Sequence, residues 1–325
     1  MQVLIIGCGE IGTECARLLH ARGHAVSGLR RNASMLPAWM ERLSADVLDK
    51  DSLLPLQSTT ADIVIYQVAA SAFNEDAYRA AYLTGLRHCT ERLRDRAIPL
   101  LFVSSTSVYH QNDGSWVDES SPVQPQTFNG QIMLEAEQLV AELSGSASIR
   151  FSGIYGPRRL RLIQQVKSGV NNPGAAGAAV LTNRIHSQDC AAVLAHLAEI
   201  YLQPGLQHPP LWLASDCEPA SRSDVFSFIR EELGIAKTDS ETEGKAVLAQ
   251  AGQHLQLLRL APNDKGVLEV NVAIIVSESI AAIDSNTRTT VADMVTLSQI
   301  CSSRFAACHE SAIGFSCRLT IILPV

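Results

Sequence analysis

The sequence predicts an α/β protein built on a doubly wound parallel sheet. The chain opens with an apolar run (residues 1–6), a glycine-rich turn and a stretch with helical periodicity (13–20). Further apolar runs of strand length then alternate with helical stretches. This alternation is typical of parallel strands with helices on both faces of the sheet. With 325 residues and 46% hydrophobic content, the chain is long enough for a substantial core.

The glycine-rich turn carries the spacing G-x-G-x-x-G between a strand and a helix, which is the context expected of a dinucleotide-binding fingerprint. Gly7 allows the tight turn, Gly9 lets a pyrophosphate approach the backbone, and Gly12 permits close packing of helix on strand. The phosphates would lie at the helix N-terminus, beside Glu10 and Ile11. The alternative is a glycine turn in an unrelated βα unit.

The second predicted strand, residues 24–29, ends in Arg30 and Arg31. In an NAD site, an acidic residue at this position binds the ribose 2′-hydroxyl. No acid is present here, and an arginine would instead pair with a 2′-phosphate. The sequence therefore predicts NADP as the cofactor, with NAD as the alternative. A solvated pair of arginines after a strand is the interpretation that carries no function.

The next elements complete the predicted sheet. Strands are expected at residues 45–49, 62–68, 99–104 and 210–214, and helices at 78–94, 188–202 and 221–232. Small residues at the carboxyl end of a central strand leave room for a ligand. Further cofactor-binding residues are therefore expected after the third and fourth strands, namely Asp46, Val47, Val68, Ala69 and Ala70.

A run of hydroxyl residues, Ser104 to Ser107, is followed by Val108 and Tyr109. It resembles the SSxxVYG segment of the extended short-chain dehydrogenase/reductases, in the nucleoside-diphosphate-sugar epimerase/dehydratase group. Segments 118–122, 150–158 and 183–189 also resemble that group, and the similarity covers roughly the first 235 residues. The resemblance implies a Rossmann-type fold and places Ser105 at the catalytic Ser/Thr position.

The chain departs from this family at its catalytic pair. The family carries Tyr-x-x-x-Lys on a helix, whereas here Asn129 takes the tyrosine position and Met133 the lysine position. Three interpretations remain. The site uses another acid, for which Tyr109 and His110 are the nearest candidates; the protein binds NADP without turnover, as a sensor or regulator; or it is a degraded enzyme. Ordinary core packing is the alternative role for Tyr109.

The resemblance also identifies residues on the substrate side. Arg158, Arg184 and His186 lie in segments that face the substrate in epimerase-like proteins, and arginines suit phosphate or carboxylate groups. A solvated cationic surface is the alternative for each arginine. Asp189 is expected to cap the helix that follows.

The helix of residues 129–143 carries an apolar stripe at helical spacing: Met133, Ala136, Leu139, Val140 and Leu143. Part of this stripe must pack on the core. The resemblance adds that this helix commonly forms a homodimer face.

The composition excludes several classes of partner. The net charge is −7 and no basic run is long enough to form a nucleic-acid patch. No stretch of transmembrane length is free of charge, and the first residues lead into a core strand, so we expect neither a membrane partner nor a signal peptide. The eight cysteines show neither disulfide nor zinc spacing. They indicate reduced thiols in the cytoplasm and no metal site.

We therefore expect an NAD(P)-binding Rossmann domain at residues 1–155 and a substrate-side region at 156–236. The family's usual C-terminal part is not recognisable in residues 237–325. Three interpretations of this segment stay open: a divergent segment, a poorly ordered one, or the product of an altered reading frame. Two functions are considered. One is an NADP-preferring, epimerase-like oxidoreductase that acts on a nucleotide sugar or a similar polar hydroxyl or carbonyl substrate. The other is a non-catalytic NAD(P)H-binding sensor.

Overall fold

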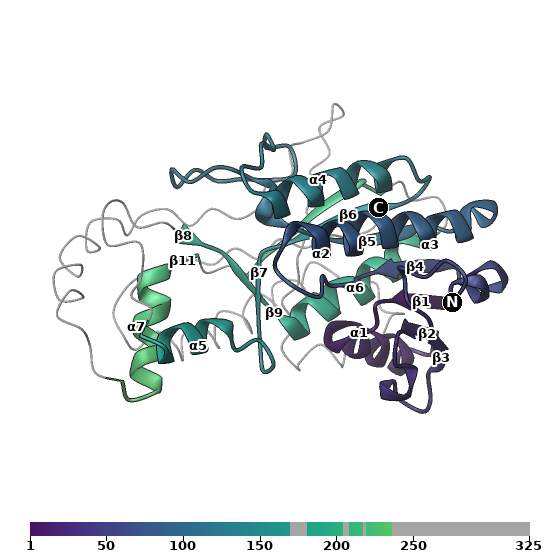
Figure 1. Cartoon of the computed structure of the whole chain (residues 1–325), viewed down its shortest axis with the longest axis horizontal. Coiled ribbons are helices and arrows are strands. Elements are labelled where there is room, and N and C mark those ends of the chain that lie inside the picture. The colour runs from purple at the N-terminus through teal and green to yellow at the C-terminus, as the bar shows by residue number, and fades with distance from the viewer. Residues whose placement is uncertain (170–180, 204–207, 217–218, 236–325) are drawn as a thin grey trace, which may run out of the picture. The chain divides into compact units, whose positions relative to one another are not determined.

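The computed structural model describes residues 1–169, 181–203, 208–216 and 219–235 (Figure 1). The predicted third region, 237–325, lies outside the described residues. Met1–Phe226 forms one compact unit, and Ser227–Val325 is assigned to a second. The site described below lies within the first unit.

The first unit is built on a seven-stranded sheet with the order β10-β6-β5-β4-β1-β2-β3, in which every neighbouring pair is parallel. This arrangement confirms the doubly wound parallel sheet. Its central strand β1 is buried from Val3 to Ile6, as expected for a strand covered on both faces. The strands are β1 (Gln2–Ile6), β2 (Ala25–Arg30), β3 (Glu41–Ser44), β4 (Ile63–Tyr66), β5 (Leu100–Ser105), β6 (Ala147–Phe151) and β10 (Leu211–Ala214).

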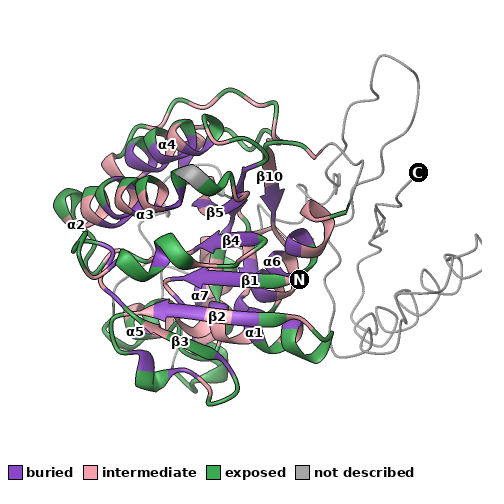
Figure 2. Cartoon of the chain, turned by 90° about the vertical axis from the view of Figure 1, so that its right-hand side faces the viewer, coloured by how far each residue is buried: buried purple, intermediate pink, exposed green. Residues whose placement is uncertain are grey.

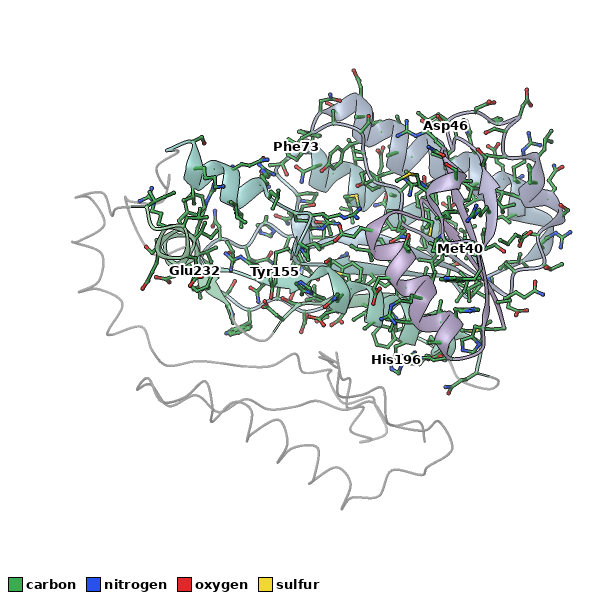
Figure 3. The ribbon with its side chains drawn as sticks, turned by 90° about the horizontal axis from the view of Figure 1, so that it is seen from below. Met40, Asp46, Phe73, Tyr155, His196 and Glu232 are labelled. Atoms are coloured by element: carbon green, nitrogen blue, oxygen red, sulfur yellow. The ribbon has the colours of Figure 1, made fainter. Side chains whose placement is uncertain are left out.

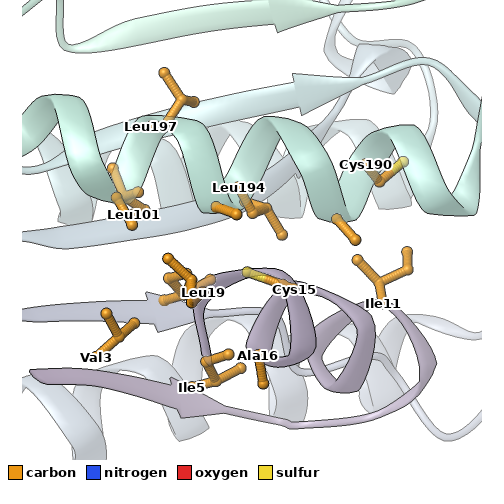
Figure 4. Packing of buried hydrophobic residues seen from close by; sticks show 14 of the residues in the cluster. Val3, Ile5, Ile11, Cys15, Ala16, Leu19, Leu101, Cys190, Leu194 and Leu197 are labelled. Carbon is orange, nitrogen blue, oxygen red and sulfur yellow. The ribbon is translucent and has the colours of Figure 1, made fainter. Parts of the chain in front are cut away.

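Helices cover both faces of this sheet. On one face, α1 (Glu10–Ala21) and α6 (Ser187–Tyr201) pack together through Cys15, Leu19 and Leu194 (Figure 4). On the other face lie α2 (Glu75–Arg79), α3 (Gly85–Leu93) and α4 (Phe128–Ala141). Burial of the sheet between these layers is visible in Figure 2. Removal of apolar surface from water on both faces is the main stabilising contribution.

Two predicted elements need correction, and one strand was missed. The strand expected at residues 45–49 is wrong, because β3 ends at Ser44; as an exposed edge strand it carries polar side chains and lacks an apolar pattern. Strand β6 was not expected, although it is fully buried. The helix predicted at 78–94 is divided by a π-helical turn at Ala80–Thr84.

A smaller group of elements follows β6. Strand β7 (Gly153–Tyr155) pairs in parallel with β9 (Arg184–His186), and β8 (Leu181–Thr182) pairs antiparallel with β11 (Ala220–Ser221). Helix α5 (Arg161–Lys167) lies beside them in Figure 1, and α7 (Arg222–Glu232) follows β11. Within the described part of the chain, no helix is both long and apolar enough to cross a membrane.

Candidate dinucleotide and catalytic site

The glycine turn lies where the sheet order reverses, because β1 is flanked by β2 on one side and by β4 on the other. Gly7 has a φ of +80°, and its N–H donates to the Leu29 carbonyl at 2.9 Å. A Cβ on Gly7 would lie 2.7 Å from the Cα of Val68, just after β4. Only glycine fits this left-handed conformation and close approach.

The N-terminus of α1 offers free backbone donors beside this turn. The first intrahelical bond runs from the Thr13 N–H to the Gly9 carbonyl at 2.9 Å, and no side chain caps the helix at Gly9. The N–H groups of Glu10, Ile11 and Gly12 therefore have no partner within the helix. A Cβ on Gly9 would meet only the Gly7 carbonyl, at 3.8 Å, so the space in front of the turn is open. These features fit an anionic pyrophosphate.

The Gln67 side chain lies against Gly12, the last glycine of the turn, and was not predicted as a site residue from the sequence. A Cβ on Gly12 would lie 1.7 Å from Nε2 of Gln67 and 3.0 Å from Cγ2 of Ile5. The Gln67 Nε2 is buried without a hydrogen-bond partner among the described residues. A polar residue near the end of the apolar strand predicted at residues 62–68 was the available signal for a site residue here.

The predicted cofactor residues after β2 and β3 lie as follows. The guanidinium of Arg30 reaches back to the Cys8 carbonyl in the glycine turn, with Nη1 at 3.4 Å, whereas Arg31 is exposed. The Asp46 carboxylate accepts the Leu48 N–H at 3.0 Å, and Val47 is buried. Arg30 is thus the arginine that the fold brings to the glycine turn.

The residues predicted after β4 border the same turn. Val68 packs against Gly7, Ala69 is exposed and Ala70 is half-buried. These small side chains keep the carboxyl end of β4 open beside the turn. In the turn itself, burial raises the pKa of the Cys8 thiol to about 11, against the lowering effects of the Thr13 hydroxyl and of Arg30. Cys8 is therefore a neutral thiol near neutral pH.

Ser105 ends β5 at the same edge of the sheet and is half-buried. Its hydroxyl oxygen accepts the Ser107 N–H at 3.1 Å, and its own proton has no acceptor among the described residues. Several neighbouring polar atoms are buried without hydrogen-bond partners in the described part of the chain: Ser107 Oγ, His110 Nδ1 and Ser152 Oγ. These atoms follow β5 and β6, so this edge of the sheet holds hydrogen-bonding groups without partners, which a ligand could bind.

The hydroxyl of Tyr109 is engaged in a buried network. It donates to the Asp118 carbonyl at 2.7 Å and accepts from Arg150 Nη1 at 2.8 Å. Arg150 in turn forms a bidentate pair with Glu137 on α4, and Ser104 donates to the same carboxylate at 2.5 Å. Burial raises the pKa of the Tyr109 phenol, opposed by Arg150. These contacts engage the Tyr109 hydroxyl in a buried network in which its proton is hydrogen-bonded to the Asp118 carbonyl.

The first turn of α4 lies at this edge and carries Asn129, one of the two altered positions. A Cβ on Gly130 would lie 2.2 Å from the Ser107 carbonyl, so the first turn of α4 touches the segment after Ser105. Asn129 is half-buried in that turn, and Met133 is 3% exposed and packs in the core. The stripe predicted at residues 133–143 likewise packs against the sheet.

The substrate-side residues are partly held by local contacts. Arg158 is exposed, whereas Arg184 donates through Nη2 to the Thr182 hydroxyl at 2.7 Å, and burial lowers its pKa. His186 caps α6, because its Nδ1 accepts the Gln188 N–H at 3.3 Å. The capping role predicted for Asp189 is therefore wrong. The residues described in the structure contain no cluster of metal-ligating side chains.

Comparison with known proteins agrees with this geometry. Residues 1–177 match the model of the family described as RmlD substrate binding domain. A structure from Methylobacillus flagellatus, named as an NAD-dependent epimerase/dehydratase, is 39% identical; the match covers 73% of this chain and 83% of that one, with a TM-score of 0.63. UDP-glucose 4-epimerase of Thermus thermophilus, in complex with NAD, is 20% identical with a TM-score of 0.60, and the match covers 73% and 84% of the two chains.

Among curated proteins, Protein YeeZ of Escherichia coli K12 is 28% identical over 170 residues, which are 49% of this chain and 60% of YeeZ. The chain thus spans less than two thirds of this relative. The family match, the sheet order and the glycine turn lead to one conclusion. The chain belongs to the RmlD substrate-binding-domain family and is an atypical extended short-chain dehydrogenase/reductase with the fold of the NAD-dependent epimerases and dehydratases.

Proposed function

We propose that the protein binds a nicotinamide dinucleotide at the glycine turn and acts as an epimerase-like oxidoreductase on a polar hydroxyl or carbonyl substrate. The observation that carries this proposal is the uncapped N-terminus of α1, set against Val68 where the sheet order reverses. The unpartnered Nε2 of Gln67 beside Gly12 also fits a polar group bound there. When bound, the nicotinamide would supply hydride-transfer chemistry.

We propose NADP rather than NAD as the preferred cofactor. Strand β2 ends in Arg30, and no acid follows it where the ribose 2′-hydroxyl of NAD would need one. The Arg30 guanidinium turns toward the glycine turn, and this position supports its proposed pairing with a 2′-phosphate. Arg31 is exposed and would add a second, more screened charge.

In the proposed chemistry, Ser105 orients the reacting oxygen through its hydroxyl proton, which has no acceptor among the described residues. Asn129 cannot act as a general acid at neutral pH, Met133 carries no charge, and the Tyr109 proton is donated to the Asp118 carbonyl. His110, water or the substrate itself would therefore supply the proton. General acid–base catalysis typically contributes about 10²–10⁴-fold, so turnover should be slow.

A nucleotide sugar is the substrate candidate that the family resemblance suggests, with Arg158, Arg184 and His186 on the substrate side. We also propose that the protein forms a homodimer through the helix of residues 129–143 and that it is located in the cytoplasm. The four described cysteines are buried free thiols, which fits a reducing compartment.

A second function, a non-catalytic NAD(P)H sensor, is favoured by one observation. Met133 is packed in the core, so the helix offers neither a lysine nor room for one without repacking. One experiment separates the two functions: titration with NADPH, followed by assay of nicotinamide oxidation with a panel of nucleotide sugars and simpler carbonyl compounds. Turnover of any member supports the enzyme. Tight NADPH binding without turnover supports the sensor, and absence of NADPH binding contradicts both.

A further inference from the structure

Three aromatic rings meet at the carboxyl edge of the sheet, outside the glycine turn. Phe73, in the loop after β4, lies 5.7 Å from Tyr78 of α2 and 5.2 Å from Phe128 of α4, measured between ring centroids. Tyr78 and Phe128 are themselves 5.4 Å apart and nearly perpendicular. Yet Phe73 remains 62% exposed; its position is labelled in Figure 3. An aromatic ring held by two others but open on one side offers a surface for a further ring.

An arginine stands over this exposed ring. The guanidinium carbon of Arg161, the first residue of α5, lies 5.7 Å from the Phe73 centroid. Burial raises the pKa of Tyr78, and the nearby charge of Arg161 opposes that shift. Arg161 is exposed and forms no ion pair with a carboxylate of the described residues. A cation on a ring with no anionic partner is complementary to an anion carried by a ring.

The cluster lies next to the proposed reaction site. Phe128 directly precedes Asn129, which takes the position of the family's catalytic tyrosine. The following residue, Gly130, touches the Ser107 carbonyl in the segment after Ser105. A ligand that covers Phe73 would therefore extend along the first turn of α4 toward that serine.

We infer that the substrate is an aromatic carboxylic acid whose ring packs on Phe73 and whose carboxylate pairs with Arg161. This inference rests on the proposed function for its role in turnover, and it names a substrate class other than a nucleotide sugar. Ring surface and charge lie close together in this cluster. They match an acid group attached directly to a ring better than a nucleotide, in which ribose separates the base from the phosphate.

The test measures ligand binding by calorimetry, with and without NADPH, using four probes: 4-hydroxybenzoate, its neutral analogue 4-hydroxybenzamide, cyclohexanecarboxylate and UMP. The wild-type protein should bind 4-hydroxybenzoate about tenfold or more tightly than the amide, which lacks the charge. It should also prefer 4-hydroxybenzoate over cyclohexanecarboxylate, which lacks the flat ring.

Two variants should each remove one of these preferences. Arg161→Gln should abolish the preference for acid over amide, and Phe73→Leu the preference for the aromatic acid over cyclohexanecarboxylate. Phe73→Tyr should retain both preferences. Arg87→Gln and Met35→Ala remove an exposed arginine and an exposed apolar side chain elsewhere, and should change neither preference.

Absence of 4-hydroxybenzoate binding to the wild-type protein would overturn the inference, as would preferences that do not respond to Arg161→Gln or Phe73→Leu. UMP binding that depends on these two residues would overturn it in favour of a nucleotide. NADPH binding, followed by its own fluorescence in the same samples, reports on the proposed function separately. A protein that binds NADPH normally while failing the probe test contradicts only the aromatic-acid inference.

Discussion

Arg150 and Glu137 form a bidentate ion pair in the interior of the protein, with Nε–Oε1 and Nη2–Oε2 distances of 2.9 and 2.6 Å. Their side chains are 4% and 8% exposed, respectively. The pair joins β6 to α4, and through Arg150 Nη1 it also holds the Tyr109 hydroxyl. Since Ser104 donates to the same carboxylate, four residues from separate segments share one buried polar network.

Glu137→Gln should therefore destabilise the protein strongly, because it leaves the Arg150 charge buried without its counter-ion. Removal of one partner from a buried pair costs about 3–5 kcal/mol, which urea denaturation would measure. Arg17→Gln, which breaks the exposed Arg17–Glu14 pair, is the matched control and should change stability little. Equal effects of the two substitutions would show that the interior pair is solvated.

Gly9→Val and Gly12→Ala should separate cofactor binding from folding. A side chain on Gly9 enters open space, so the variant should keep its melting temperature but lose NADPH affinity by about tenfold or more through overlap with the pyrophosphate. A Cβ on Gly12 would instead displace Gln67, and overpacking of this kind costs about 1–3 kcal/mol. Unchanged cofactor affinity of the Gly9 variant would show that the turn is not the binding site.

Arg30→Ala should weaken NADPH binding and leave NADH binding nearly unchanged. Loss of a charge-assisted bond to a phosphate corresponds to roughly 1.5–3 kcal/mol, or about one to two decades in the dissociation constant. Arg31→Ala should have a smaller effect in the same direction, because Arg31 is exposed and Arg30 faces the glycine turn. Fluorescence titration with both cofactors measures the difference. An equal loss for NADPH and NADH would remove the basis for NADP preference.

The double substitution Asn129→Tyr and Met133→Lys should increase any hydride-transfer rate, by up to about 10²-fold, if the missing acid limits turnover. It should also lower stability, because the lysine replaces a side chain that is 3% exposed in the core. Ser105→Ala should reduce the rate about tenfold, since the hydroxyl no longer orients the reacting oxygen. If the wild type turns over at ordinary dehydrogenase rates and Ser105→Ala leaves that rate unchanged, the active site lies elsewhere.

Glu119 should make stability depend on pH. Its Oε1 accepts the Leu213 N–H at 2.8 Å, whereas Oε2 is buried without a hydrogen-bond partner among the described residues. Burial raises the carboxyl pKa above its ordinary 4.5. The hydrogen bond from the Leu213 N–H is the main opposing cause, Asp118 raises the pKa further, and Arg150 lowers it slightly. The folded state then retains a proton that the unfolded state releases, so this group's contribution falls as pH rises from about 4.5 through the raised value.

Glu119→Gln mimics the protonated carboxyl and retains an oxygen acceptor for Leu213. It should therefore match or exceed the wild type in stability at neutral pH and show a flatter profile across the acidic range. Urea denaturation at a series of pH values would measure both. A variant less stable than the wild type at neutral pH would mean that the ionised carboxylate stabilises the fold.

The glycine turn and the parallel sheet were predictable, because both depend on local patterns of apolar and glycine residues. Ser105 was identified by its position before Tyr109 in the segment that resembles the family's SSxxVYG motif. The structure puts it at the carboxyl end of β5. The order of the strands confirms that alternation of strand and helix was sufficient for the main sheet.

Long-range contacts were not predictable in the same way. No local pattern shows that Arg150 meets Glu137, or that Gln67 lies against Gly12, because these contacts depend on how separate elements pack. Strand β3 was misplaced because an exposed edge strand lacks a buried face and its apolar pattern. The contacts of Phe73 with α2 and α4 likewise required the assembled fold.

The N-termini of α1 and α6 lie side by side, and the Ser187 hydroxyl contacts the Glu10 carboxylate at 3.5 Å. The two helices pack on each other and run in the same direction (Figure 4), so the positive ends of two dipoles lie at the same edge of the sheet. These partial charges belong to the backbone and have no pKa. The contribution of these dipoles to anion attraction should thus persist at any pH at which the fold exists.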